Sequence, residues 1–237
     1  MSPEPAGPFI WTNATVLTVE VRVARAAAVA LLPAALRLPD PPTATLFIAE
    51  YPETQFGSVY REAAVLLHVE DATGPTLHCP WMVVDDDTAL ILGREVLGFP
   101  KKMAEIVLAA RDGGLIGTVR RRGTEIMCLD ATLHEPETNP EPLFARRMVN
   151  VIGTPTSGMR LVELPPAAEV IHSALRAEVR VTLRSSERDA LGELDAVPTG
   201  RARAVHADFG ALGGPPAQAM GDVDADWIAR RFFARAL

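Results

Sequence analysis

Alternation of apolar and polar residues recurs along this chain, and it constrains the fold more than any other feature. Its two-residue period is typical of half-buried β-strands. The segments that we expect to form strands are 14–23, 43–51, 58–70, 77–86, 103–110, 115–123, 125–134, 147–153, 168–186 (with a break inside it) and 201–210. Because strands follow one another without regularly alternating helices, the order argues against a doubly wound parallel sheet.

Three segments favour helices. The first, 23–36, is expected to end near Pro33, and the second, 85–98, has an Asp or Thr to cap its start and Gly98 just past its end. The third, 222–237, places apolar side chains between arginines, namely Trp227, Phe232 or Phe233, and Leu237. This amphipathic pattern predicts a helix that docks on the body of the protein or on a neighbouring subunit.

The proline-rich stretches are short. Residues 39–42, 136–142 and 214–216 are typical of surface loops, and none is long enough to link two domains. With 237 residues, the chain can form one sizeable core. We therefore expect a single domain over residues 1–237.

Charge and composition exclude several classes of partner. The net charge of −7 argues against a nucleic-acid-binding protein. The one basic run, Arg120–Arg122, is expected at a solvated sheet edge or in a salt bridge between subunits. The start of the chain lacks the features of a secretory signal, and the most apolar stretch, 24–38, is too short to span a bilayer. We expect a cytoplasmic protein without a membrane partner.

Most chemical motifs are missing from the sequence. It contains no G-x-G-x-x-G, P-loop, H-E-x-x-H or G-x-S-x-G, and Cys79 and Cys128 are isolated, so we expect neither a cofactor nor a metal site. The five histidines are scattered. Two of them, His68 and His172, lie in predicted strands, where we expect hydrogen-bonded structural roles.

The lysines are unusual. Of 23 lysines and arginines, only the adjacent Lys101 and Lys102 are lysine. Arginine can replace a surface lysine, but it cannot replace a nucleophilic amine because its guanidinium stays protonated. Genome composition is an alternative explanation of the bias. The local setting, with Leu97, Phe99 and Met103, disfavours an ammonium ion, and a second ammonium acts in the same direction.

The geometry around Pro100 predicts how the two lysines are presented. Pro100 fixes its own φ and biases Phe99 towards extended backbone. In an extended segment, the side chains of Lys101 and Lys102 point to opposite faces, so one can enter a cavity while the other packs elsewhere. The spacing does not say which lysine enters.

The stretch GREVLGFPKKMAEI, residues 93–106, resembles the G-R-E-x(4)-P-K-K signature of the acetoacetate decarboxylase superfamily. The resemblance implies that the first lysine, Lys101, forms a Schiff base with a ketone substrate. This superfamily is itself the standard example of a lysine activated by desolvation or a neighbouring cation.

Further stretches extend the resemblance over most of the chain. They are GPF at 7–9, FGSVYREAAV at 56–65, WMVVDDDTALILGRE at 81–95 and the β-rich segment 185–209. In the second stretch the resemblance implies that Tyr60 and Glu62 face the site, and a spacing of two on a strand puts both on one face. The implied fold is α+β, mostly β, with antiparallel sheets forming a cone-like β-barrel around a central pocket and a few flanking helices.

One departure from the superfamily concerns its N-terminal arginine, which can meet the substrate carboxylate. The matching position here is Ala14, and no arginine precedes Arg22. We therefore favour aldolase, retro-aldolase or dehydratase chemistry on pyruvate-like compounds. Decarboxylation of acetoacetate or another β-keto acid is the alternative, and a non-catalytic ligand-binding protein is the second alternative.

The resemblance also suggests a role for each residue of the expected site. Lys101 is the nucleophile, Glu62 transfers protons, and Tyr60 hydrogen-bonds the substrate. The supporting residues are Lys102 and the pair Arg94 and Glu95, which we expect to form an ion pair at the helix end. Expected pocket residues are Phe99, Leu97 and Met82. The expected partner is a small keto acid or ketone, and the protein is expected to be a homo-oligomer.

Overall fold

The computed structural model describes residues 9–144, 146–164, 166–211 and 218–236. Gly7 and Pro8 of the N-terminal resemblance, the proline-rich stretch 214–216 and Leu237 lie outside the described residues, as do the side chains of Phe232 and Phe233.

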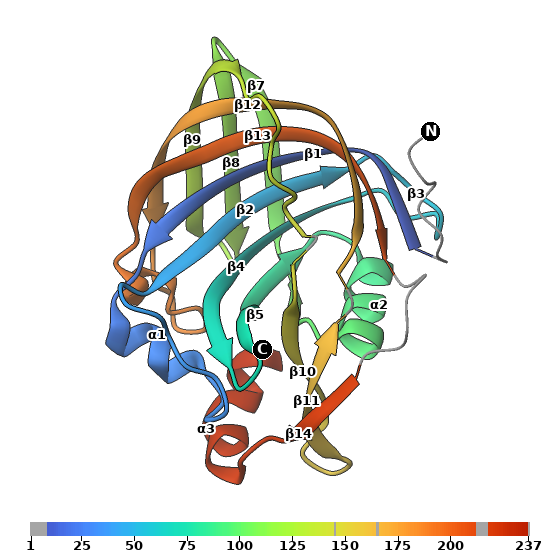
Figure 1. Ribbon diagram of the computed structural model, residues 1–237, viewed down its shortest axis with the longest axis vertical. Coiled ribbons are helices and arrows are strands. Elements are labelled where there is room, and N and C mark those ends of the chain that lie inside the picture. The colour runs from blue at the N-terminus through green and yellow to red at the C-terminus, as the bar shows by residue number, and fades with distance from the viewer. Residues whose placement is uncertain (1–8, 145, 165, 212–217, 237) are drawn as a thin grey trace.

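Strands dominate the described part of the chain, as the alternating pattern predicts (Figure 1). They are β1 (Phe9–Arg22), β2 (Thr43–Tyr51), β3 (Glu53–Thr54), β4 (Tyr60–Asp71), β5 (Gly74–Val84), β6 (Lys101–Met103), β7 (Glu105–Arg111), β8 (Gly114–Arg121), β9 (Thr124–Pro136), β10 (Met148–Thr154), β11 (Gly158–Leu164), β12 (Ala168–Leu183), β13 (Val197–Ala211) and β14 (Gln218–Asp222). The expected strand at 168–186 is one continuous strand, because two register shifts take up the irregularity that suggested a break.

All fourteen described strands join one curved sheet in the order β14-β11-β10-β5-β4-β2-β1-β13-β12-β9-β8-β7, with β3 beside β1 and β6 beside β5. The path is open, since β14 and β7 end it without pairing to each other within the described residues. The prediction of a closed barrel is therefore not confirmed.

The sheet is mixed rather than wholly antiparallel. Strand β5 pairs in parallel with β6 and, at one register position, with β10. The β5–β6 pairing has a local cause. A helix connects the two strands, and such a crossover returns the chain in the same direction.

The described residues contain three α-helices, α1 (Arg25–Leu31), α2 (Asp87–Leu97) and α3 (Ala225–Ala236), and one 3₁₀ turn, η1 (Leu191–Leu194). As predicted, the Asp86 carboxylate caps α2 by accepting a hydrogen bond from the Ala89 N–H, and Gly98 ends it with a φ of 67°. Trp227 anchors α3 in the core, which confirms docking on the body of the protein. None of the described helices has the length and apolar character that a membrane crossing requires.

Both faces of the central strands are buried. On β2, Leu46 and Ile48 belong to one hydrophobic cluster, while Phe47 and Ala49 belong to a second cluster on the other face. The first cluster contains Trp227. The second contains the aromatic side chains around which the candidate site is built.

Candidate active site

Lys101 and Lys102 occupy β6, which lies beside β5 with Lys101 opposite Met82 and Lys102 opposite Val83. Helix α2 ends at Leu97, and the turn through Gly98 and Pro100 leads directly into this strand. Because β6 is extended, the two lysine side chains leave its backbone on opposite sides. Both residues are buried, each only 5% exposed.

The structure brings Lys101, Glu62 and Tyr60 together. The Lys101 Nζ lies 2.6 Å from the Glu62 Oε2 and 5.3 Å from the centre of the Tyr60 ring. Tyr60 and Glu62 project from the same face of β4, as their spacing predicts. The resulting group contains a buried amine, a buried carboxylate and a phenol.

Two tyrosines beside Glu62 stay protonated at neutral pH. Burial raises the pKa of Tyr60 well above its usual value, and the Glu62 carboxylate raises it further. Burial and then Glu62 and Glu169 likewise raise the pKa of Tyr51. The Tyr60 hydroxyl accepts a hydrogen bond from the Trp11 Nε1–H at 2.8 Å, which leaves its own proton available for donation.

Sequence reasoning missed Tyr51 and Trp11. Tyr51 lies directly opposite Tyr60 in the β2–β4 register, and Trp11 lies near the start of β1. Their position in the site depends on strand pairing between distant segments, so no local sequence pattern could have identified them.

A cavity of about 120 Å³ opens beside Lys101. The three expected pocket residues, Met82, Leu97 and Phe99, all line it, together with Lys101, Glu62 and Tyr60. Met103, which we expected to contribute to the apolar setting, is instead 45% exposed. A water needs roughly 10–15 Å³ of such space, so the cavity has room for a small ligand beside Lys101.

Gly93 leaves the space through which the Lys101 side chain passes. A Cβ atom at position 93 would lie 2.4 Å from the Lys101 Cε and 2.9 Å from its Nζ. Real Cβ atoms do not approach other atoms so closely, so any larger residue would displace the lysine. Gly93 lies in the interior of α2, and a glycine inside a helical pattern was the available signal for this role.

Lys102 lies in a different environment, with its Nζ 3.0 Å from the Asp189 Oδ1. The Trp81 Nε1–H donates to the same oxygen at 2.8 Å, and the Arg121 Nε lies 2.8 Å from the Asp189 Oδ2. The prediction that Arg121 lies at a solvated edge or between subunits is therefore wrong. Its strand places it on the buried face towards Asp189.

The buried cluster around Asp189 shifts the pKa values of its members. Burial lowers the pKa of Lys102, and Asp189 opposes that effect. Burial by itself would raise the pKa of Asp189, but the hydrogen bond from Trp81, the charge and hydrogen bond of Lys102 and the hydrogen bond from Arg121 bring it below its usual value. Asp189 thus balances the Lys102 charge on the side of β6 away from Lys101.

Arg94 supports the lysine strand, although not through the expected partner. Its Nη1–H donates to the Lys101 carbonyl oxygen at 3.0 Å. No ion pair between Arg94 and Glu95 occurs among the described residues, so that prediction is wrong. Adjacent residues on a helix do not face each other, and the Glu95 residue is exposed.

Ala14, the position that matches the superfamily's N-terminal arginine, has no contact with solvent. Ala14 is fully buried in the cluster that includes Tyr51 and Tyr60. A different arginine, Arg146, lines the cavity from the segment before β10, with its side chain 47% exposed. No local sequence pattern indicated Arg146, because its proximity to Lys101 depends on the path of a loop.

No histidine is among the described residues that line the lysine cavity. His68 is hydrogen-bonded to the hydroxyls of Thr43 and Thr45, and His172 lies 2.9 Å from the Asp208 carboxylate, so both have the structural roles we expected. Among the residues that the structure describes, no three His, Cys, Asp or Glu side chains are grouped closely enough to hold a metal ion.

Solved structures with the same fold include an acetoacetate decarboxylase from Legionella pneumophila. It has a TM-score of 0.77 and 17% identity, over 94% of this chain and 93% of that one. The enduracididine biosynthesis enzyme MppR, complexed with pyruvate, has a TM-score of 0.74 and 20% identity, over 94% and 92%. An acetoacetate decarboxylase-like enzyme from Sphingomonas wittichii RW1 has a TM-score of 0.74 and 22% identity, over 94% and 98%.

Curated relatives match part of the chain. The acetoacetate decarboxylase of Acidiphilium cryptum is 32% identical over 115 residues, which cover 48% of this chain and 46% of that protein. Acetoacetate decarboxylase 1 of Mesorhizobium japonicum is 28% identical over 167 residues, 64% of each. The chain thus matches about half to two thirds of the length of these relatives. The family model described as acetoacetate decarboxylase (ADC) matches residues 1–218, so this chain belongs to the acetoacetate decarboxylase family.

Proposed function

We propose that this protein is a Schiff-base-forming lyase that acts on small keto acids or ketones through Lys101. The observation that carries the proposal is the buried contact of 2.6 Å between the Lys101 Nζ and the Glu62 Oε2 at a small cavity. An amine that must lose a proton and a carboxylate that can accept it are in direct contact.

The proposed mechanism begins with transfer of a proton from the Lys101 ammonium to Glu62. The neutral amine attacks the ketone carbon, and one of its two protons passes to the carbonyl oxygen, which becomes a hydroxyl. Glu62 then returns its proton to this hydroxyl, which leaves as water and gives a protonated imine. Tyr60, whose raised pKa keeps it protonated, donates a hydrogen bond to the oxygen during these steps.

The protonated imine then accepts electrons from a breaking bond. We favour aldol, retro-aldol or dehydration chemistry on pyruvate-like substrates, because Ala14 leaves the N-terminal strand without a carboxylate-binding arginine. The complex of MppR with pyruvate supports pyruvate as the first compound to test.

β-Keto acid decarboxylation is the alternative. It is supported by the names of the curated relatives and by Arg146, which offers a cation at the cavity wall. A non-catalytic pocket protein is the second alternative, and the contact between Lys101 and Glu62 argues against it. The single domain, the homo-oligomer and the cytoplasmic location stay predictions.

Borohydride reduction tests the imine directly. The protein is incubated with pyruvate, acetoacetate or a larger ketone, reduced, digested and analysed by mass spectrometry. We expect a reduced adduct on Lys101, and an absence of adduct with every ketone would contradict the proposal. Product analysis with pyruvate plus an aldehyde, against carbon dioxide release from acetoacetate, separates the two reaction types.

A further inference from the structure

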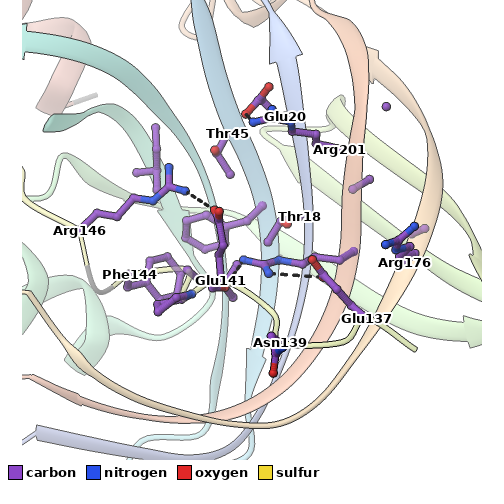
Figure 2. A pocket seen from close by; sticks show the side chains of 18 of the residues that line it. Thr18, Glu20, Thr45, Glu137, Asn139, Glu141, Phe144, Arg146, Arg176 and Arg201 are labelled. Atoms are coloured by element: carbon purple, nitrogen blue, oxygen red, sulfur yellow. Dashed lines mark hydrogen bonds and ion pairs between the residues drawn. The ribbon is translucent and has the colours of Figure 1, made fainter. Parts of the chain in front are cut away.

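A second and larger cavity adjoins the lysine cavity. Its volume is about 660 Å³, compared with about 120 Å³ beside Lys101, and it falls within the size range of small-molecule binding sites. We call it the polar chamber. Figure 2 shows charged, hydroxyl and amide side chains around it, including those labelled Thr18, Glu20, Thr45, Asn139, Glu141 and Arg146.

The two cavities share a wall. Phe47, Leu66, Phe144 and Arg146 line both of them. On β2, Thr45 lines the polar chamber, Phe47 lines both cavities and Tyr51 lines the lysine cavity. Since these residues are separated by even spacings on one strand, they face the same side of the sheet. A ligand bound at Lys101 therefore has the polar chamber as its neighbouring space.

Phe144 stands at the boundary and is held there. Its ring centre lies 5.4 Å from that of Phe47 and 5.1 Å from that of Phe209. The Glu169 carboxylate accepts hydrogen bonds from the backbone N–H groups of Leu143 and Phe144, at 2.8 and 3.0 Å. These contacts fix the boundary from which Arg146 reaches both cavities.

Three of the four arginines that line the polar chamber have weak counter-ions, and the fourth, Arg203, lies 3.5 Å from Glu137 with its side chain 14% exposed. Arg146 lies 3.2 Å from Glu141, with the two side chains 47% and 79% exposed. The Arg201–Glu20 and Arg176–Glu135 contacts are 3.7 and 3.6 Å. Exposed pairs of this kind contribute at most about 1 kcal/mol. A ligand carboxylate can replace such a glutamate, and it gains further by binding an arginine through two parallel hydrogen bonds.

We propose that the polar chamber binds a carboxylate-bearing part of the substrate that lies beyond the reacting carbonyl, with Arg146 as its principal cation. The inference rests on the proposed function for the reacting end of that substrate. Its consequence is a substrate class, namely keto acids with a second carboxylate, or the carboxylate-bearing product of their condensation. The lysine cavity holds the ketone, and Glu141 competes with the ligand for Arg146.

Matched keto acids test this assignment. Borohydride trapping at Lys101 is measured against the concentration of 2-oxoglutarate, 2-oxoadipate and 2-oxopimelate, and of monocarboxylic 2-oxo acids of the same chain lengths. We expect half-maximal trapping at a concentration at least about tenfold lower for one or more of the dicarboxylates, a difference that one good ion pair can supply. Equal concentrations for every matched pair would overturn the assignment.

Three variants locate the effect. Arg146→Gln should remove the preference for the dicarboxylate, and Glu141→Gln should strengthen it several-fold because the competing carboxylate is gone. Arg25→Gln is the control, since Arg25 forms a similarly exposed ion pair at 3.0 Å and lines neither cavity. A weaker preference in Glu141→Gln would contradict the proposed competition.

A binding measurement separates this inference from the imine chemistry. Binding of glutarate and adipate to the Lys101→Met variant, which cannot form an imine, is measured by saturation-transfer NMR. Binding that Arg146→Gln abolishes supports the polar chamber even when no keto acid is trapped. Trapping of pyruvate without dicarboxylate preference or binding leaves the lysine chemistry intact and overturns the chamber. A change in solution mass in Arg146→Gln, with unchanged ligand binding, would assign the chamber to a contact between copies.

Discussion

The two sides of β6 use the same residue type for different purposes. On one side, Lys101 contacts a single carboxylate, Glu62, at the wall of a cavity. On the other side, Lys102 shares Asp189 with Arg121 and Trp81 in a packed cluster. Both lysines are 5% exposed, so burial alone does not distinguish them. What differs is whether the amine faces space that a substrate can fill.

The largest expected effect separates the two lysines directly. Lys101→Arg should abolish borohydride trapping and turnover, because a guanidinium cannot form an imine. Lys102→Arg should keep trapping at Lys101 and lower only the stability, since arginine retains the charge that Asp189 pairs. Mass spectrometry of the adduct and thermal unfolding measure the two outcomes. Undiminished turnover in Lys101→Arg would contradict the mechanism.

Glu62→Gln removes the carboxylate that contacts Lys101 and keeps a side chain of nearly the same shape. We expect the rate of imine formation to fall about 10²- to 10⁴-fold, the usual contribution of a general acid–base group. Glu95→Gln is the control, because Glu95 is exposed on the neighbouring helix. Stopped-flow absorbance with a ketone measures the rate. A loss of stability with an unchanged rate would assign Glu62 a structural role only.

Asp189→Asn removes the carboxylate that pairs with Lys102 and Arg121. It leaves the buried charges of Lys102 and Arg121 without their carboxylate, so the free energy of unfolding should fall by about 3–5 kcal/mol. Asp40→Asn, at a side chain that is 93% exposed, should cost less than about 1 kcal/mol. Urea unfolding measures both. Equal losses in the two variants would show that the cluster does not stabilise the fold.

Gly93→Ala tests whether the space beside Gly93 is needed to position the Lys101 side chain. The added methyl would displace Lys101, and a misplacement of about 1 Å can lower a rate about 10²-fold. Alanine favours the helix by up to about 1 kcal/mol over glycine, so the stability should change little. The control is Ala89→Gly, in the same helix. Gly57→Ala does not serve as a control, because Gly57 has a φ of 77°, which residues with a side chain rarely adopt. Imine formation at the wild-type rate in Gly93→Ala would exclude the steric role of position 93.

The smallest expected effect is in the acid dependence of stability. Asp189 has a lowered pKa, so its contribution is fully present above the unfolded pKa of about 3.9 and is lost as the pH falls through the lower folded pKa. Trp81→Phe removes one hydrogen bond that lowers this pKa. In that variant Asp189 should contribute less to the free energy of unfolding, and this contribution should be completely lost at a higher pH than in the wild type.

Urea unfolding between about pH 7 and about pH 2 measures this dependence. Trp11→Phe is the control, because its indole N–H donates to Tyr60 rather than to Asp189. The same pH dependence in Trp81→Phe and in the wild type would show that the hydrogen bond has no effect on Asp189.

Local patterns predicted the elements well. The period of two identified β2 to the residue, and Asp86 and Gly98 marked the two ends of α2. These features depend on nearby residues, through side-chain alternation, capping and the left-handed conformation that glycine adopts easily. The short strands β3 and β14 were missed because pairing with distant strands, rather than local sequence, defines them. Strand β11 was also missed, although it pairs with the preceding strand, β10.

Local residue patterns were enough to predict that the chain is rich in strands, that Tyr60 and Glu62 share a face, and that the two lysine side chains diverge. The partner of each lysine depends on how the whole chain folds. Asp189 reaches Lys102 from 87 positions away along the chain, and Arg146 reaches the cavity from a loop. The fold of the whole chain also leaves β14 and β7 as unpaired ends of the sheet within the described residues. Such contacts depend on register and chain path across the whole fold, which no local spacing of residues specifies.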